Sequence, residues 1–302
     1  MRKLFTFLSF SCIVLFSEAQ TDLPPVLEIK TDTIDFHIPS NKVQTLEDNS
    51  GKLTFEQVSQ APLIDSFHLN KTRTYNFSAY AFWFRFRLKN TMDHAEDICF
   101  QTSAEYTDYY IRRADGTWRH FQTGTGVPRS KIEGIESLLC ITLSVNPGEE
   151  LLIYRRDRNN NAYVSPADFD TYILFKDKVI KGAYIVYKNS YWRDVASILL
   201  AGILILAAFF NFFFYRSTRD KVYLYFAMFV LFYGILKSSA SLFVIFFWDQ
   251  PRLFEVIQNV CGTLYIFSIS NFIRHYFQTP LYNKKWDRIL IGVAFAFSLP
   301  TL

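Results

Sequence analysis

The sequence lacks the motifs by which most enzymes are recognised. It has no glycine-rich nucleotide loop, no phosphoacceptor helix, no metal-ligand cluster and no G-x-S-x-G elbow. The histidines are scattered along the chain, a distribution typical of surface or strand roles rather than of metal ligation, at His37, His68, His94, His120 and His275. We therefore expect no catalytic residues, no metal, no cofactor and no enzymatic activity of the chain itself.

A strong charge of either sign is also lacking. The formal net charge is +4 over 302 residues, and the lysines and arginines form no dense patch interleaved with aromatic side chains. These features argue against nucleic acid as a partner.

Cysteine is scarce, with four residues in the whole chain. Cys12 falls in a predicted signal peptide and Cys261 in a predicted membrane span, which leaves Cys99 and Cys140 in a predicted exported domain. Export permits a disulfide between these two cysteines. The alternative is that both are small buried hydrophobic side chains on strands.

The N-terminus has the order of a secretory signal. Arg2 and Lys3 precede an apolar stretch from Leu4 to Phe16, and Ser17-Glu18-Ala19 supplies small residues before the predicted cleavage at Gln20. Residues 1–19 are therefore predicted to be a signal peptide. A lipoprotein signal with Cys12 as the lipidated residue is the alternative, although the apolar core continues beyond Cys12.

Residues 23–175 are predicted to form an all-β sandwich, because turn signals recur at short spacing and no helical periodicity persists. In the clearest strand, Phe82, Phe84, Phe86 and Leu88 alternate with residues expected to face water, namely Trp83, Arg85, Arg87 and Lys89. The predicted strands are Tyr80–Lys89, Asp97–Gln101, Tyr106–Arg113, Trp118–Gln122, Leu138–Val145, Leu151–Arg156 and Thr171–Phe175.

A helical membrane region is predicted over residues 194–302, after a linker at 176–193. Its apolar runs predict spans at 195–215, 222–240 and 253–277 and an incomplete fourth span at 289–302, each full span having about the 20 residues that cross a bilayer. The sequence ends inside the fourth span, which leaves open a gene fragment, a frameshifted remnant, a partial sequence or a complete product.

Basic residues in the loops give an orientation that is independent of the signal peptide. The first and third loops are rich in Lys and Arg, whereas the second contains only Arg252. Positive loops lie in the cytoplasm, so the N-terminal domain is expected in the periplasm and the helices in the bacterial inner (cytoplasmic) membrane.

Several segments, in their order along the chain, resemble the seven-transmembrane receptors with diverse intracellular signalling modules that carry the second type of extracellular domain. They are Gly51-Lys52-Leu53-Thr54, Phe82-Trp83-Phe84-Arg85-Phe86, Leu139-Cys140-Ile141-Thr142-Leu143 with Asn146-Pro147-Gly148-Glu149, Asn211-Phe212, Arg219-Asp220-Lys221 and Tyr223-Leu224-Tyr225. The resemblance implies a jelly-roll-like sandwich similar to carbohydrate-binding modules, a sugar-like or other small ligand, and a cytoplasmic output module beyond this sequence.

Alternation on one strand suggests where such a ligand would bind. Tyr106, Asp108, Tyr110 and Arg112 share the more polar face of their strand, and Trp118 on the next strand is placed to join them. Aromatic rings can stack on a sugar while charged groups bind its hydroxyls. The alternative is a solvated sheet face with cross-strand aromatic pairs.

In the membrane region, Asn211 is predicted either to bond a neighbouring helix or to take part in signalling directly. The sequence as a whole predicts a transmembrane signalling receptor whose sandwich binds a carbohydrate-like or other small ligand, with a homodimer expected by analogy with membrane sensors. A membrane-tethered binding module without signalling is the alternative.

Overall fold

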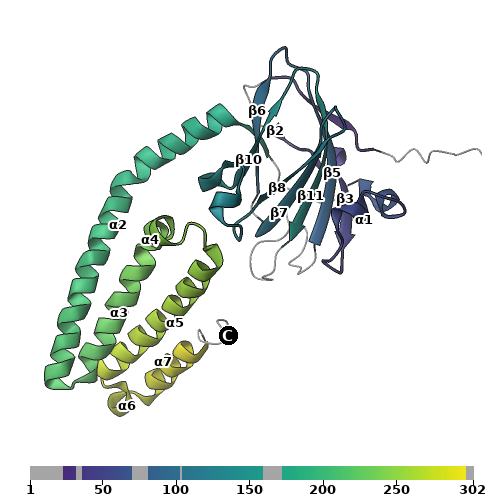
Figure 1. Cartoon of the computed structure of the whole chain (residues 1–302). Coiled ribbons are helices and arrows are strands. Elements are labelled where there is room, and N and C mark those ends of the chain that lie inside the picture. Colours follow the sequence, from purple (N-terminus) through teal and green to yellow (C-terminus); the bar gives the residue numbers. More distant parts are fainter. Residues whose placement is uncertain (1–22, 32–35, 70–80, 103, 159–171, 297–302) are drawn as a thin grey trace, which may run out of the picture.

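The computed structural model describes residues 23–31, 36–69, 81–102, 104–158 and 172–296 (Figure 1). The predicted signal peptide lies outside the described residues. A β-sandwich occupies the N-terminal part of the chain and a group of long helices the C-terminal part, and the two are joined by α2 (Figure 1). This order of a strand-rich domain followed by apolar helices confirms the predicted fold class.

The sandwich consists of two largely antiparallel sheets. The larger sheet has the order β4-β3-β5-β11-β7-β8, with β1 paired in parallel to β5, and the smaller has the order β2-β12-β6-β10-β9. The strands are β1 (Val26–Ile29), β2 (Phe36–His37), β3 (Gln44–Asp48), β4 (His68–Leu69), β5 (Ala81–Asn90), β6 (Glu96–Gln101), β7 (Tyr106–Arg112), β8 (Trp118–Thr123), β9 (Gly134–Ile135), β10 (Cys140–Val145), β11 (Glu150–Arg158) and β12 (Tyr172–Phe175). The seven predicted strands are all present, with ends that agree to within about two residues.

Alternating apolar residues of the two sheets meet in one core. The larger sheet contributes Phe84 and Phe86 of β5 and Ile153 of β11. The smaller sheet contributes Phe100 of β6 and Ile141 of β10, and all five side chains are buried. The period-2 pattern that the sequence shows on β5 therefore does point its phenylalanines inward.

The sequence predicts that the other face of β5 is exposed to water, but this prediction is wrong for Trp83 and Arg85, which are buried. Trp83 and Arg85 are only 0% and 1% exposed, because residues 49–69, which follow β3, fold back over this face. This segment carries α1 (Phe55–Val58) and one 3₁₀ turn (Leu63–Ser66), and its Val58 and Phe67 build a second apolar cluster around Trp83 together with Tyr154 of β11. A neighbouring segment, which the alternation of one strand cannot reveal, has covered the face.

A buried ion pair lies within the larger sheet. The guanidinium of Arg155 donates to both carboxylate oxygens of Asp157 at 2.8 and 2.6 Å, and each residue is 1% exposed. Thr107 also donates to Asp157 at 2.9 Å, and its hydroxyl lies 2.8 Å from that of Thr102. The network is therefore continuous with the β6–β7 turn, since Thr102 accepts from the N–H of Ala104.

The helical region packs as antiparallel neighbours in chain order (Figure 1). Its helices are α2 (Lys176–Thr218), α3 (Lys221–Lys237), α4 (Ser239–Phe246), α5 (Pro251–Tyr276), α6 (Thr279–Tyr282) and α7 (Lys284–Ala296). By length and composition, α2 and α5 can each cross a membrane, and α3 with α4 forms a third such segment if their 65° bend lies within one span. The predicted incomplete span at 289–302 overlaps α7, and its last residues lie outside the described ones.

Small residues let α2 and α3 approach closely. A Cβ on Gly234 would lie 3.4 Å from the Cβ of Leu204 and 3.6 Å from the carbonyl oxygen of Ala201. Between α3 and α5 the contact is aromatic, with the rings of Phe229 and Tyr265 5.4 Å apart. Without a hydrophobic effect between helices in lipid, such close packing is what holds spans together.

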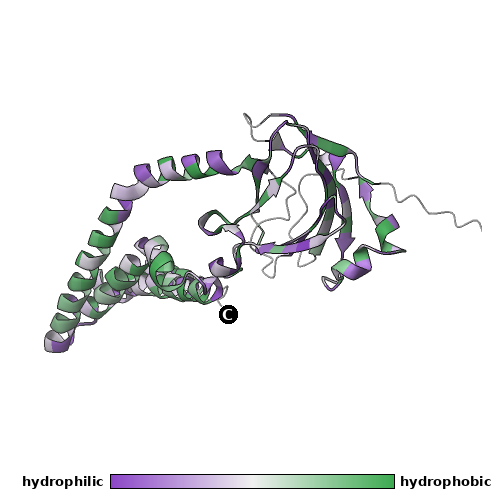
Figure 2. Cartoon of the chain, turned by 45° about the horizontal axis from the view of Figure 1, so that its top comes forward, coloured by the Kyte–Doolittle hydropathy of each residue, from purple (hydrophilic) through white to green (hydrophobic). Residues whose placement is uncertain are grey.

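Two expectations for the membrane region differ from what the structure contains. The amide of Asn211 donates to the carbonyl of Ala207 on its own helix at 2.8 Å, rather than to a neighbouring helix. The stretch 176–193, predicted as a linker, is helical and continues without a break into the first span. Figure 2 shows the change along α2 from a hydrophilic end at the sandwich to an apolar length beyond it.

Cys99 and Cys140 are both buried free thiols in the structure, so the disulfide considered above is not formed in it. The Sγ of Cys99 lies 3.6 Å from the hydroxyl of Thr142, and that of Cys140 lies 3.5 Å from the carbonyl of Leu138. Burial raises the pKa of Cys140 to about 12 and also raises the pKa of Cys99.

A thiol-labelling experiment tests this state. Because only a thiolate reacts and both thiols are buried, Cys99 and Cys140 should resist iodoacetamide in the folded protein and react fully in denaturant without reductant. Peptide mass spectrometry of the labelled protein gives the result. A Cys99–Cys140 disulfide peptide, or no labelling in denaturant without reductant, would contradict the free-thiol arrangement.

Candidate functional site at the sandwich face and at the junction

The strand predicted to carry a ligand face does alternate as expected. Thr107, Tyr109 and Ile111 of β7 are fully buried, whereas the members of the other set are half-buried or exposed: Tyr106, Asp108, Tyr110 and Arg112. Across to β8, Asp108 is opposite Gln122, Tyr110 is opposite His120 and Arg112 is opposite Trp118. Four of the five predicted residues, all but Tyr106, therefore form adjoining rows on one face.

Tyr110 is already stacked on the protein's own rings. Phe55 of α1 lies parallel to it with centroids 4.3 Å apart, and His120 stacks on it at 4.6 Å. Phe55 is placed there by a capping box in which Thr54 and Gln57 satisfy each other's backbone N–H groups at the start of α1.

Beside this stack, Trp118 remains accessible to a ligand. Its side chain is 40% exposed and meets Phe55 edge-on at 4.8 Å. The carboxylate of Asp108 lies 2.8 Å from Nε2 of His120, and it accepts a hydrogen bond from the side-chain amide of Gln122 at 3.3 Å. The arrangement offers one exposed indole face next to a small polar network, which suits a ligand with both an apolar face and hydroxyl groups.

Tyr106 belongs to a different place, the junction between the sandwich and the helices. Its hydroxyl accepts a hydrogen bond at 3.1 Å from Arg252, the second residue of α5. The same guanidinium pairs with the carboxylate of Glu105, which is only 3% exposed, and with Glu255 one turn along α5 at 2.9 Å. The start of α5 is thus held against the β6–β7 turn.

Two further bonds fix the loop between α4 and α5 on the sandwich. Asp249 accepts the backbone N–H of Ser130 at 2.8 Å, and the indole N–H of Trp248 donates to Glu136 at 3.1 Å. The bond from Ser130 holds the pKa of Asp249 below its ordinary range. The junction therefore consists of several polar contacts from one short loop and the first turn of α5.

The sandwich side of the junction requires glycine at two positions. A Cβ on Gly124, whose φ is +132°, would meet the carbonyl oxygen of Glu105 at 2.3 Å, and one on Gly126 would meet the ring of Tyr106 at 2.8 Å. These close approaches allow Gly126 to donate its N–H to the Glu105 carbonyl at 2.9 Å. The loop at 124–127 is consequently packed directly on the two residues that bind Arg252.

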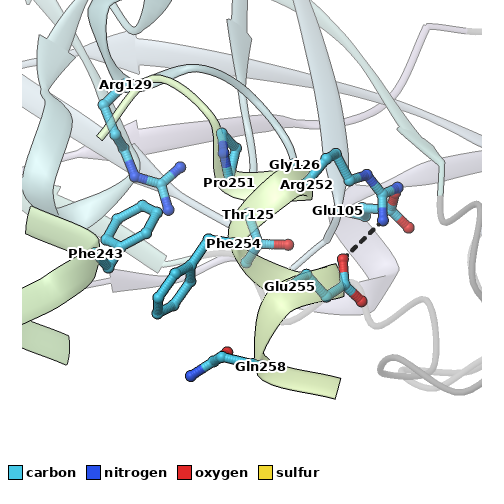
Figure 3. Close-up of a pocket in the computed structure, with 10 residues that line it drawn as sticks. All are labelled: Glu105, Thr125, Gly126, Arg129, Phe243, Pro251, Arg252, Phe254, Glu255 and Gln258. Carbon is cyan, nitrogen blue, oxygen red and sulfur yellow. Dashed lines mark hydrogen bonds and ion pairs between the residues drawn. The ribbon is translucent and has the colours of Figure 1, made fainter. Parts of the chain in front are cut away.

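A cavity of about 350 Å³ lies at this junction (Figure 3). The sandwich contributes Glu105, Thr125, Gly126 and Arg129, and the helices contribute Phe243, Pro251, Arg252, Phe254, Glu255 and Gln258. In the part of the chain that the structure describes, no group of three or more His, Cys, Asp or Glu side chains could hold a metal ion. The cavity is instead a mixed apolar and charged space.

Two protein families match the sequence, one on each side of this junction. Residues 40–169 match the family described as 7TMR-DISM extracellular 2, and residues 193–302 match the family described as 7TM diverse intracellular signalling. The chain belongs to the seven-transmembrane receptors with diverse intracellular signalling modules. No curated protein sequence matches it.

As a member of this family, the chain is a membrane protein of the transmembrane sensory receptor type, with one segment matched to the extracellular domain and one to the seven-transmembrane region. The matched boundary falls within α2, which passes from the receptor's extracellular domain into its membrane region. In the structure the α4–α5 loop contacts the sandwich, while the α2–α3 turn and α6 lie at the far end of the helices (Figure 1). The predicted placement of these loops on opposite sides agrees with this arrangement.

Sequence reasoning missed most of the junction of the receptor. Three of its residues are common types in loops without a recognisable motif, namely Glu105, Arg129 and Asp249. A single sequence does not show that such residues contact others more than a hundred positions away. One signal was available: Arg252 is the only basic residue in a loop predicted to face outward. In the structure this arginine pairs with the buried carboxylate of Glu105.

The receptor has a second attachment where α2 leaves the sandwich. Lys176, the first residue of α2, pairs with Asp97 of β6 at 3.0 Å. The bond to Lys176 lowers the pKa of Asp97 from its ordinary 3.8, and Asp97 in turn raises the pKa of Lys176 from its ordinary 10.5. The pair thus stabilises the point at which the helix begins.

The pH dependence of this attachment follows from those directions. A lowered carboxyl pKa gives a contribution that is complete above 3.8 and lost as the pH falls through the folded-state value; a raised amine pKa gives one that is complete below 10.5 and lost as the pH rises through the folded-state value. The melting temperature of the wild type should therefore exceed that of Lys176→Met between these limits, and the difference should shrink as the pH moves beyond them. A constant difference at pH 3 and pH 7 would contradict the ion pair.

Removing the guanidinium of Arg252 should loosen the junction. Arg252→Gln leaves the carboxylate of Glu105 buried without its cation, at a cost of about 2 to 5 kcal/mol for a buried pair and toward the lower end here because Arg252 is 38% exposed. About 2 kcal/mol corresponds to a roughly 30-fold larger equilibrium population of the open junction.

Hydrogen exchange of Ser130 provides the measurement, since its N–H is bonded to Asp249 across the junction. The segment around Ser130 should exchange faster in Arg252→Gln and at the wild-type rate in Arg193→Gln, which removes an arginine that is 76% exposed on α2. Unchanged exchange in both variants would show that Arg252 does not hold the junction closed.

Proposed function

We propose that this receptor senses a carbohydrate-like or other small ligand in the periplasm of a bacterial cell and passes the signal through its inner-membrane helices. The observation that carries the proposal is the contact of Arg252 with Glu105 and Tyr106, because it joins the strand of the candidate ligand face to the first turn of α5. A ligand that prefers one arrangement of the sandwich over another would thereby also favour one arrangement of the helices.

The ligand face is proposed at Asp108, Tyr110, Arg112 and Trp118, with His120 as an additional member. Support comes from the exposed ring of Trp118 beside the polar group formed by Asp108 and His120. Tyr106 is assigned a different role, since its hydroxyl binds Arg252 and therefore relates the face to the helices. A stacked aromatic ring contributes about 1 kcal/mol beyond the area that it buries.

Replacement of Trp118 tests the ligand face. We expect the full chain in nanodiscs to bind one or more members of a glycan and small-metabolite library, and Trp118→Ala to lower that affinity about 10-fold or more through lost ring burial and stacking. The matched control is Tyr172→Ala, which removes an aromatic of similar exposure, 42%, from the smaller sheet.

The same samples separate sensing from mere tethering. If the ligand changes the exchange of the Ser130 segment in the wild type but not in Arg252→Gln, the junction transmits its binding. If the ligand binds and the exchange stays constant, the sandwich serves as a tethered binding module, which is the alternative function. Equal affinity of Trp118→Ala and the wild type would remove Trp118 from the ligand face.

A further inference from the structure

The cavity at the junction contains a buried positive charge that no carboxylate balances. Arg129 is 9% exposed, and its guanidinium donates to two backbone carbonyls, those of Gly124 at 3.2 Å and Val127 at 3.0 Å. Among the residues that the structure describes, no carboxylate forms an ion pair with it. The two carboxylates that line the cavity, Glu105 and Glu255, both pair with Arg252 instead.

An unbalanced charge of this kind is unusual in a protein interior. Arg155, another buried arginine of the sandwich, pairs with both carboxylate oxygens of Asp157. Buried ions are normally paired because removal from water costs several kcal/mol for each ion. Burial accordingly lowers the pKa of the Arg129 guanidinium.

Around this charge the cavity is apolar. The guanidinium carbon of Arg129 lies 5.3 Å from the ring centroid of Phe243, and Phe254 lines the same space. Figure 3 shows the two rings beside Arg129, on the side of the cavity away from Glu105, Arg252 and Glu255. An occupant would thus meet one cationic group and two phenyl rings together.

The position of the cavity along the helices indicates which kind of molecule could occupy it. Four of its lining residues belong to the first turns of α5 beyond Pro251, where the loop ends and the apolar span begins, and Phe243 belongs to α4, which exposes Val244, Ile245 and Phe246. With α5 crossing a bilayer, such a position would lie at the level of the lipid headgroups, where one end of a site is wet and the other apolar. Its volume of about 350 Å³ lies within the range of small-molecule sites.

We propose that this cavity is a second ligand site of the receptor, which binds an anionic amphiphile with its phosphate or carboxylate at Arg129 and its hydrocarbon part between Phe243 and Phe254. A bound anion would supply the charge that Arg129 lacks, and charged hydrogen bonds of this type are the strong ones. Because the site has one wall on the sandwich and one on α4 and α5, its occupant would strengthen the docking of the two regions. The site is separate from the proposed ligand face at Trp118.

Octyl phosphate is a suitable probe, with octanol as its uncharged counterpart. For the full chain in phosphatidylcholine nanodiscs, calorimetry should show saturable binding of octyl phosphate that falls about 10-fold or more in Arg129→Gln, because a charged hydrogen-bonding partner is lost. The exposed Arg119→Gln is the matched control for charge, and Trp118→Ala is the control for the sandwich face; both should bind as the wild type does. Octanol should bind equally to the wild type and Arg129→Gln.

Equal binding of octyl phosphate by the wild type and Arg129→Gln would overturn the proposal, as would octanol binding as tightly as octyl phosphate. If Arg129→Gln does not fold, Gln258→Trp provides the decision, since it fills the cavity and leaves Arg129 in place. Retained affinity in Gln258→Trp would then overturn the proposal, and lost affinity would support it.

Nanodiscs that also contain phosphatidylglycerol distinguish the two sources of such an anion. If the lipid weakens octyl phosphate binding to the wild type, the natural occupant comes from the bilayer. If the lipid has no effect, the site takes a soluble amphiphile. Either result requires the Arg129 dependence described above, so both support the site.

Discussion

A buried carboxylate whose cation comes from another part of the chain ties the two halves of this receptor together. Glu105 lies beneath the glycine loop at 124–127 with 3% exposure, and its partner Arg252 is the second residue of a membrane helix. A carboxylate buried in this way without a cation would cost several kcal/mol. The sandwich end and the start of α5 therefore reach their stable arrangement together.

Strand β6 connects this contact with the other attachment of the helices. Near its start, Asp97 holds Lys176 at the beginning of α2, and just beyond its end Glu105 holds Arg252 at the beginning of α5. A movement of β6 relative to the larger sheet would consequently reach two helices at once. The buried network of Arg155, Asp157 and Thr102 adjoins the same turn and relates it to the sandwich interior.

Helix α2 extends from the sandwich through the whole helical region. With 43 residues, the helix is roughly 65 Å long at 1.5 Å per residue. It packs on α3 through Ala201 and Gly234, and α3 in turn packs on α5 through aromatic rings. The helices are thus attached to the sandwich at two points, one near the start of β6 and one just beyond its end.

The sequence allowed good prediction where a local pattern decides the structure. Alternation on β5 and β7 and the spacing of turns identified seven strands, because period 2 and turn chemistry are local properties. The cover over Trp83 and Arg85 could not be predicted in this way, since it depends on where α1 returns in space. The contacts of Glu105 and Arg129 could not be predicted either. Glu105 pairs with Arg252, 147 positions away, and Arg129 lies over the ring of Phe243, 114 positions away.

The position of α1 limits how a ligand can use the sandwich face. A ligand that stacks on Tyr110 must first displace the ring of Phe55, which is half-buried, at part of the about 1.5 to 3 kcal/mol that full burial of a phenylalanine contributes. A ligand that stacks on Trp118 and bonds Asp108 and His120 meets no such cost. Weak ligands should therefore occupy the Trp118 side alone. Only a ligand with a larger stacking surface would move α1, and since α1 also covers Trp83 on β5, that movement would expose the centre of the larger sheet.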